Sequence, residues 1–229
     1  MSYLKKILIN ITKTLGFYSA LKKIQLNIIL YLGLGHGHSL LLKLLKKKTY
    51  LYGKNKIFIE IGSSRDSVFG QGSTELIANF CQKTKTNFFT VDANKKTTLL
   101  LKKKFKKYKY TKAINALGEN FSKKFTKKID ILYLDAFDIF TKNPSKERKL
   151  FYKINLKKKI TNNESATMHC EVIKNFLKNL SKKCLIVFDD TFVNNNKITG
   201  KGKTAIPLLI KNDFRIIKKN NNSVALERN

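Results

Sequence analysis

The sequence has no tryptophan, two prolines and three cysteines in 229 residues. Cys81, Cys170 and Cys184 have neither the number nor the spacing of a disulfide framework or a zinc site, so we expect free thiols and a reducing compartment. No apolar run approaches the roughly 20 residues that cross a bilayer. The basic N-terminus is not followed by a small-residue cleavage site. We therefore expect neither a membrane-spanning nor a secreted protein.

Acidic residues are also scarce. The chain has 15 of them against 47 basic residues, which gives a net charge of +32, and eleven lysines but no acid precede Glu60. Such a chain attracts phosphate backbones and anionic lipid headgroups. Only four basic residues are arginines, the side chain that contacts phosphate in bidentate fashion. Two interpretations stay open: a lysine-rich composition without function, as in an AT-rich genome, and a surface that binds nucleic acid or a membrane.

The first 50 residues differ in composition from the rest. We predict a cationic helical extension over residues 1–50 and a second domain over residues 51–229. Within the extension, Leu21–Leu32 and Ser39–Lys48 have the pattern of amphipathic helices. They could cover the ligand edge of the second domain, lie on a membrane surface or form a dimer contact. We favour a lid or packing function.

From Ile57 onward, short β-branched or aromatic runs alternate with helical stretches, which is typical of an α/β fold. We predict a Rossmann-like, mostly parallel sheet of seven strands, with helices on both faces and a C-terminal antiparallel hairpin. The predicted strands are Ile57–Ile61, Asn87–Asp92, Lys112–Ala116, Ile129–Asp135, Cys184–Asp189, Phe214–Lys219 and Ser223–Glu227. The predicted helices are Ser73–Gln82, with Ser73 as N-cap, Lys95–Lys107, Glu119–Lys127, Ser165–Leu180 and Lys203–Lys211. Residues 139–165 are predicted to be an insertion after the fourth strand.

Acidic residues gather where the predicted strands end. They are Glu60, Asp92, Asp135 with Asp138, and Asp189 with Asp190. Ligands of open α/β sheets bind at this edge. The loop after Glu60 lacks G-x-G-x-x-G, which disfavours a dinucleotide-dependent oxidoreductase. Glu60 suits a cationic group and Asp92 suits the hydroxyls of a ribose, so we predict a nucleoside ligand that carries positive charge.

Four segments resemble class I S-adenosylmethionine-dependent methyltransferases over about residues 55–229. They are Glu60-Ile-Gly62, Val91-Asp92, Leu134-Asp135 and the terminal hairpin. The resemblance implies S-adenosyl-L-methionine as cofactor. The residues it implies as cofactor-binding are Glu60, Gly62, Ser63, Ser64, Arg65, Asp92, Gly118, Glu119 and Asp135. Arg65 would pair with the methionine carboxylate of the cofactor, or else with Asp66 on the surface.

Tyr133-Leu-Asp135 and Val187-Phe-Asp-Asp190 are similar to the metal-dependent O-methyltransferases, both the catechol and caffeoyl-coenzyme A type and the macrocin type that acts on sugars. That resemblance implies Asp135, Asp189 and Asp190 as ligands of Mg²⁺ or a similar cation. Electrostatic repulsion supports a bound cation independently, because three close carboxylates repel one another unless they are protonated or neutralised by a cation. Hard oxygen ligands favour Mg²⁺. A metal would lower the pKa of an acceptor hydroxyl.

Two residues are candidates for the general base. Asp138 follows Asp135 by three residues, close to where macrocin-type relatives place a base, and His169 is expected to open the helix after the insertion. The alternatives are a helix cap for Asp138 and a solvent-facing position for His169.

Together these features predict an enzyme that methylates a hydroxyl of a small molecule or a sugar or glycan, assisted by a divalent metal. The alternatives are a nucleic-acid methyltransferase of the same fold and a membrane-surface methyltransferase that acts on a glycolipid. No Asn-Pro-Pro-Tyr-like motif follows the fourth strand, which speaks against amino methylation of nucleic acid. We expect a cytoplasmic protein, or one peripheral at the inner membrane surface. A homo-oligomer stays open.

Overall fold

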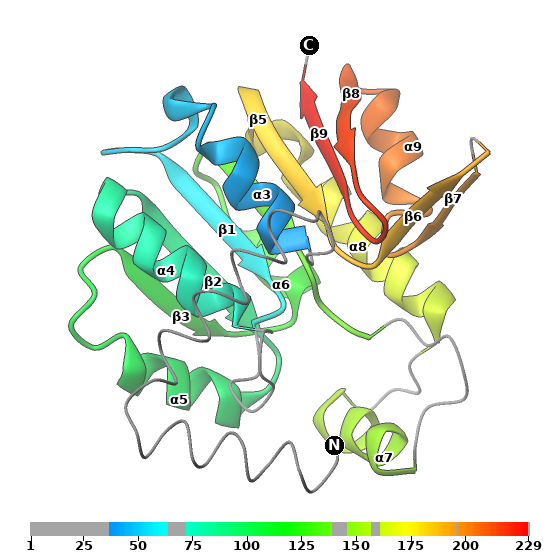
Figure 1. Ribbon diagram of the computed structural model, residues 1–229. Coiled ribbons are helices and arrows are strands. Elements are labelled where there is room, and N and C mark those ends of the chain that lie inside the picture. Colours follow the sequence, from blue (N-terminus) through cyan, green and yellow to red (C-terminus); the bar gives the residue numbers. More distant parts are fainter. Residues whose placement is uncertain (1–36, 64–71, 139–145, 157–160, 196, 229) are drawn as a thin grey trace, which may run out of the picture.

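A seven-stranded sheet forms the centre of the molecule (Figure 1). The computed structural model describes residues 37–63, 72–138, 146–156, 161–195 and 197–228. The strand order is β3-β2-β1-β4-β5-β9-β8. The strands are β1 Ile57–Ile61, β2 Asn87–Asp92, β3 Thr111–Asn115, β4 Ile129–Leu134, β5 Leu180–Phe188, β8 Phe214–Lys219 and β9 Val224–Arg228. The first five are parallel, whereas β9 runs antiparallel to both β5 and β8, as predicted.

Helices cover both faces of the sheet (Figure 1). One face packs against α3 Gly37–Leu45, α4 Ser73–Thr84 and α5 Lys95–Lys104. The opposite face packs against α6 Gly118–Lys124, α8 Asn162–Phe176 and α9 Ala205–Ile210. The described residues also form α7 Lys146–Leu156 and two short 3-10 helices, Thr49–Leu51 and Leu177–Asn179. Two helical layers therefore cover the sheet, which explains why β1 and β4 are buried along their whole length.

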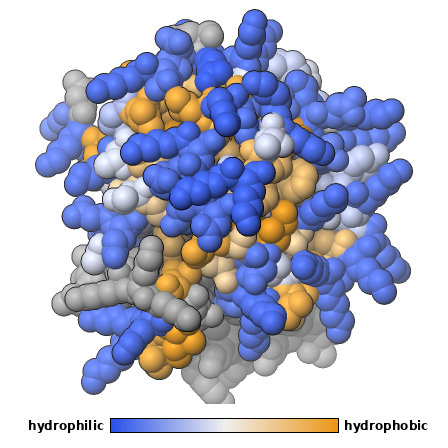
Figure 2. All heavy atoms as spheres, turned by 180° about the vertical axis from the view of Figure 1, so that it is seen from behind, coloured by the Kyte–Doolittle hydropathy of each residue, from blue (hydrophilic) through white to orange (hydrophobic). Residues whose placement is uncertain are grey.

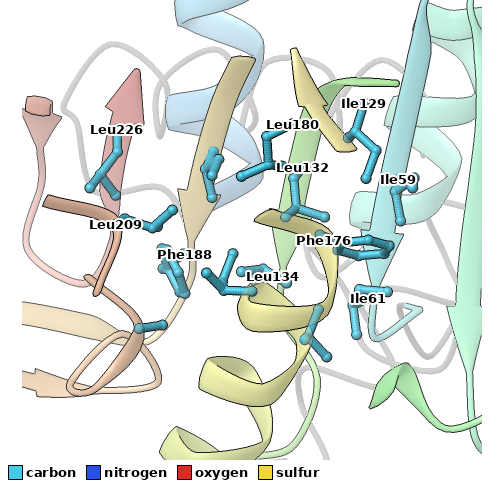
Figure 3. Close-up of a cluster of buried hydrophobic side chains, with 14 of the residues drawn as sticks. Ile59, Ile61, Ile129, Leu132, Leu134, Phe176, Leu180, Phe188, Leu209 and Leu226 are labelled. Atoms are coloured by element: carbon cyan, nitrogen blue, oxygen red, sulfur yellow. The ribbon is translucent and has the colours of Figure 1, made fainter. Parts of the chain in front are cut away.

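The larger hydrophobic cluster lies between the sheet and α8 (Figure 3). Alternate residues of β1, Ile59 and Ile61, point into it together with Leu132 and Leu134 of β4. Phe176 of α8 packs on the same face. Because successive side chains of a strand point to opposite faces, Phe58 belongs to the second cluster, under α4. The central strands are thus held from both sides, and their carboxyl ends are held in register.

Several predicted boundaries need correction. The stretch after β5 forms a two-stranded hairpin, β6 Thr191–Asn194 with β7 Lys197–Gly200, which the pattern did not indicate. Helix α7 lies in the predicted insertion. Gly72, not Ser73, precedes the first turn of α4, because the Ser73 hydroxyl donates to Glu60 instead. Helix α8 begins at Asn162 with a Thr161–Glu164 capping box, so His169 lies within the helix and does not open it.

Helix α3 packs against the sheet. Leu40, Leu41 and Leu45 are buried in the same cluster as Tyr133 of β4 and Leu185 of β5. The apolar side of the predicted helix Ser39–Lys48 is therefore covered by the protein itself, which supports the packing function for this part of the extension. The other predicted helix, Leu21–Leu32, lies outside the described residues. The division at residue 50 stays a prediction, although α3 shares its core with β4 and β5.

The back of the molecule is mostly hydrophilic where its residues are described. Figure 2 shows the face opposite to the view of Figure 1, where hydrophilic side chains surround small hydrophobic patches. Across the part of the chain that the structure describes, every helix is too short or too polar to cross a membrane.

The burial of α3 predicts a large effect of Leu41→Ala on stability. Removing a fully buried leucine leaves a cavity and costs about 2 to 5 kcal/mol of unfolding free energy. Urea denaturation measures the change, with Lys43→Ala on the exposed side of the same helix as the control. Equal midpoints for Leu41→Ala and the unmodified chain would show that α3 contributes nothing to the folded core.

Candidate cofactor pocket and carboxylate cluster

A pocket lies at the carboxyl ends of β1, β2, β3 and β4, on both sides of the point where the strand order reverses. Gly62 follows β1 with a φ of 95°, a conformation that favours glycine. A Cβ at this position would lie 2.4 Å from the backbone nitrogen of Ala136, which follows β4. The close approach of these two loops forms the floor of the pocket, and any larger residue at position 62 would separate them.

Asp92 ends β2 and lines the pocket. Its Oδ2 accepts the backbone N–H of Ser63 at 3.1 Å, and its Oδ1 accepts the backbone N–H of Asn94 at 2.6 Å. The Ser63 hydroxyl is bonded in turn to Thr90 Oγ1 at 2.6 Å. The two loops therefore hold the carboxylate at a set angle on the wall of the pocket.

Glu119 lies on the same pocket, in the first turn of α6. Its Oε2 is buried and has no hydrogen-bond partner among the described residues. Gly118 allows the approach, since a Cβ there would lie 2.7 Å from Cγ2 of Ile61. Buried polar atoms are almost always paired in folded proteins, so an unpaired carboxylate oxygen on a pocket wall indicates a ligand with an N–H or O–H donor.

Glu60 lies beside the pocket, not on its lining. The side chain is fully buried and accepts three hydroxyls, from Ser73 at 3.1 Å, Thr74 at 2.8 Å and Thr90 at 2.6 Å. Burial raises the pKa of Glu60 to about 8, although these hydrogen bonds oppose the shift. The residue joins β1 to β2 and to the start of α4. Ser64 and Arg65, also predicted to bind the cofactor, lie outside the described residues.

The aspartates that follow β4 and β5 do come together. Tyr133 connects two of them, since its hydroxyl donates to Asp189 Oδ2 at 2.9 Å and lies 3.4 Å from Asp135 Oδ2. Asp189 Oδ1 accepts the N–H of Gly37, at the start of α3, and the N–H of Asp190, both at 3.0 Å. Both oxygens of Asp189 are thus used by protein donors.

An ammonium group lies between the other two aspartates. Lys201 Nζ is 2.6 Å from Asp135 Oδ1 and 2.9 Å from Asp190 Oδ2. Burial lowers the pKa of Lys201, but the three aspartates outweigh it and raise the pKa above its ordinary value. Burial raises the pKa of Asp135 to about 7 against the opposing effect of Lys201. Because a quarter of the Asp135 side chain is exposed and the ammonium is so close, we assign a charged pair.

The predicted ligand set does not fit Mg²⁺. Asp189 has its lone pairs directed at protein donors, and Asp135 and Asp190 face a lysine ammonium. In the part of the chain that the structure describes, no three His, Cys, Asp or Glu side chains are arranged to hold a metal ion. The sequence predicted that a metal ion neutralises the carboxylates at this edge, whereas the structure places the ammonium of Lys201 between two of them.

The two candidate bases differ in their access to the pocket. His169 is fully buried; its Nδ1–H donates to the Ser165 carbonyl at 2.7 Å, and its Nε2 has no partner within the described ranges. Burial and the charge of Lys201 lower the pKa of His169 to about 3, so the imidazole is neutral. Asp138 accepts the hydroxyl of Tyr152, which lines the pocket. Asp138 is thus linked to the pocket lining through Tyr152.

Two residues of the site were missed by sequence reasoning. Tyr152 is on α7, inside the predicted insertion, and Lys201 follows the unpredicted β6–β7 hairpin. The sequence signal for Lys201 is weak, because the lysine in Gly200-Lys201-Gly202 is one of many in this chain. Tyr133 belonged to a quoted motif, but its hydroxyl was given no function.

Comparison with known proteins shows the fold. No family model and no curated protein matches the chain. Among solved structures, the N-methyltransferase NodS from Bradyrhizobium japonicum WM9 is similar over 83% of this chain and 93% of NodS, with a TM-score of 0.51 and 14% identity. NodS in complex with S-adenosyl-L-homocysteine is similar over 83% of this chain and 85% of that one, with the same score and identity. A proposed rRNA methylase from Clostridium thermocellum is similar over 82% of this chain and 97% of its own, with a TM-score of 0.50 and 11% identity. The chain therefore has the fold of class I S-adenosylmethionine-dependent methyltransferases.

The environment of Glu60 predicts a pH-dependent stability. The carboxyl ionises at its ordinary value of 4.5 in the unfolded chain and at about 8 in the folded one, so between these values only the folded state keeps the proton. Stability must fall as pH rises through this window, by up to about 1.4 kcal/mol per pH unit. Glu60→Gln lacks the titrating group, so its stability relative to the unmodified chain should improve from pH 5 to pH 8.

Urea titrations at both pH values measure this change. Glu171→Gln, which removes a partly exposed carboxylate of α8, is the control and should show no such trend. A parallel pH dependence in Glu60→Gln and the unmodified chain would rule out a protonated Glu60.

Proposed function

We propose that this protein is an S-adenosyl-L-methionine-dependent methyltransferase and that the pocket at the strand ends binds the nucleoside part of the cofactor. The observation that carries the proposal is that Asp92 and Glu119 line one pocket in the fold described above, and that Glu119 Oε2 has no partner among the described residues. Asp92 ends β2 and Glu119 lies in the helix after β3, so their carboxylates approach a bound ligand from neighbouring strand ends.

Each group fits one part of the nucleoside. The carboxylate of Asp92, held by two backbone amides, accepts the ribose hydroxyls. Glu119 Oε2 accepts the exocyclic amine of adenine, which supplies the missing donor. Apolar side chains on the same lining, among them Ala116, Leu117 and Met168, offer contacts to the flat face of the base. Gly62 leaves room for the cofactor to approach the loop after β1.

The bound cofactor supplies an electrophilic methyl group on a sulfonium. The acceptor atom forms a bond to the methyl carbon while the carbon–sulfur bond breaks, the electron pair of that bond stays on sulfur, and the acceptor loses its proton to a base. Asp135 lines the pocket and can hold an acceptor hydroxyl by accepting its hydrogen bond. Asp138, bonded to Tyr152, is the base that we retain.

We propose a hydroxyl of a small molecule or of a sugar or glycan as the acceptor. The carboxylates at the edge suit an acceptor that donates hydrogen bonds. The second candidate is methyl transfer to nucleic acid, which the net charge of +32 favours. Transfer of labelled methyl groups to total RNA, abolished by salt near 0.5 M, would favour this second candidate.

The adenine contact can be tested with a pair of ligands. In the unmodified chain, S-adenosylhomocysteine should bind about tenfold more tightly than S-inosylhomocysteine, since inosine has a carbonyl in place of the amine and a lost hydrogen bond to a charged group costs about 1.5 kcal/mol or more. In Glu119→Ala the two ligands should bind equally. Isothermal titration calorimetry measures all four affinities.

Asp92→Ala serves as the comparison variant, because it should weaken both ligands alike through the ribose. An undiminished preference for the adenosyl ligand in Glu119→Ala would place the adenine elsewhere. Absence of heat for either ligand with the unmodified chain would contradict the cofactor assignment itself.

The cationic N-terminus predicts salt-sensitive binding to anionic membranes. Residues 1–36 hold five lysines and no acid, so the full chain should sediment with vesicles of phosphatidylglycerol and phosphatidylcholine more than with phosphatidylcholine alone. Binding should fall as salt screens the charges. A chain that begins at Gly37 keeps α3 and its bond to Asp189 and is the matched variant. Equal sedimentation of the two chains would show that this segment contributes no membrane affinity.

A further inference from the structure

Lys201 is buried, whereas most of the other lysines among the described residues are exposed. Its side chain is 1% exposed, and its ammonium contacts Asp135 and Asp190. A buried ammonium is costly unless it is paired and hydrogen-bonded. Here one ammonium serves two carboxylates from different segments, the loop after β4 and the loop after β5, and so neutralises the repulsion between them.

The backbone holds Lys201 in this place independently of its side chain. The backbone N–H of Lys201 donates to the carbonyl of Asp190 at 3.1 Å. Gly200 has a φ of 82°, and a Cβ there would lie 2.0 Å from the same carbonyl oxygen. A Cβ at Gly202 would lie 2.6 Å from Cδ1 of Ile206. The β6–β7 hairpin thus returns the chain to Asp190 through a turn that requires glycine at position 200.

The third carboxylate needs no additional cation. Asp189 accepts the first N–H of α3, the N–H of Asp190 and the hydroxyl of Tyr133. The positive end of a helix of nine residues faces it. Every aspartate of the cluster therefore has a donor from the protein.

We infer that the ammonium of Lys201 is the resident cation of this cluster and stands in the position that a divalent metal would take, so that the site binds its ligands without a metal. The inference about the cation rests on geometry alone; its extension to ligand binding rests on the proposed function. An acceptor then meets carboxylates already paired with an ammonium and is held by hydrogen bonds. A single hydroxyl or amine suffices for such a site, and a chelating pair of hydroxyls is not required.

The unmodified protein provides the first test. Mn²⁺, which substitutes for Mg²⁺ at oxygen sites, should keep its free-ion electron paramagnetic resonance signal when mixed with the protein. The affinity for S-adenosylhomocysteine should be equal in EDTA and in millimolar MgCl₂. Loss of the Mn²⁺ signal with a submillimolar dissociation constant, reversed by excess Mg²⁺, would overturn the inference.

The second test removes the resident cation. Lys201→Ala leaves Asp135 and Asp190 without a positive partner, so its melting temperature should drop, Mn²⁺ should bind, and Mn²⁺ should recover part of the drop. Lys203→Ala removes the same charge from an exposed position in the same turn and should show none of these effects. A Lys201→Ala protein that melts like the unmodified chain and ignores Mn²⁺ would contradict the inference.

A third variant allows the inference to be tested even if Lys201→Ala does not fold. Lys201→Arg keeps a cation in the turn and should fold and leave the Mn²⁺ signal unchanged; binding of Mn²⁺ by this variant counts against the inference. The cofactor assignment is judged separately. If S-adenosylhomocysteine gives no heat with or without metal, the proposed function fails, whereas the Mn²⁺ results still decide what occupies the cluster.

Discussion

The ion pairs of Lys201 with Asp135 and Asp190 connect the parts of this molecule that meet at its ligand edge. Parallel strands direct their carboxyl ends to one side of the sheet, so acids that follow neighbouring strands are brought close together whether or not a ligand is present. A folded chain has to neutralise them. In this protein the neutralising group is the lysine that follows the β6–β7 hairpin, and the first N–H of α3 adds a hydrogen bond to Asp189.

Two further acids at the same edge show how burial separates chemical functions. Glu60 is the penultimate residue of β1 and Asp92 is the last residue of the adjacent β2. Glu60 is enclosed by three hydroxyls and its pKa rises to about 8, whereas Asp92 lies on the pocket. Residues one position apart on a strand point to opposite faces, so a side chain near the end of β1 can turn toward α4 while its neighbour Ile61 faces the pocket. Glu60 then supports the site by holding β1, β2 and α4 together.

Much of the fold could be predicted from the sequence. The bounds of β1, β2 and β8 agree with the predicted strands, and the antiparallel C-terminal pair was expected. These segments are short apolar runs between clear turn signals, and local pattern suffices for them. The β6–β7 hairpin escaped prediction because Thr191–Gly200 is rich in asparagine and its strands are short and only partly buried. Helix α7 escaped because it lies in a lysine-rich stretch without a strong apolar period.

By itself, the sequence determined which residues end the strands, and therefore that Asp92, Asp135, Asp189 and Asp190 share one edge of a parallel sheet. Strand period and chain connectivity are local properties and can be read along the chain. Only the tertiary structure decided what each carboxylate faces. The partner of Asp190 is a lysine brought back by a hairpin, and the partner of Asp189 is the start of a helix far away along the chain. Such partners depend on how separate elements pack, because a charge is stabilised by whatever lies within a few ångströms of it in space, and sequence distance says nothing about that.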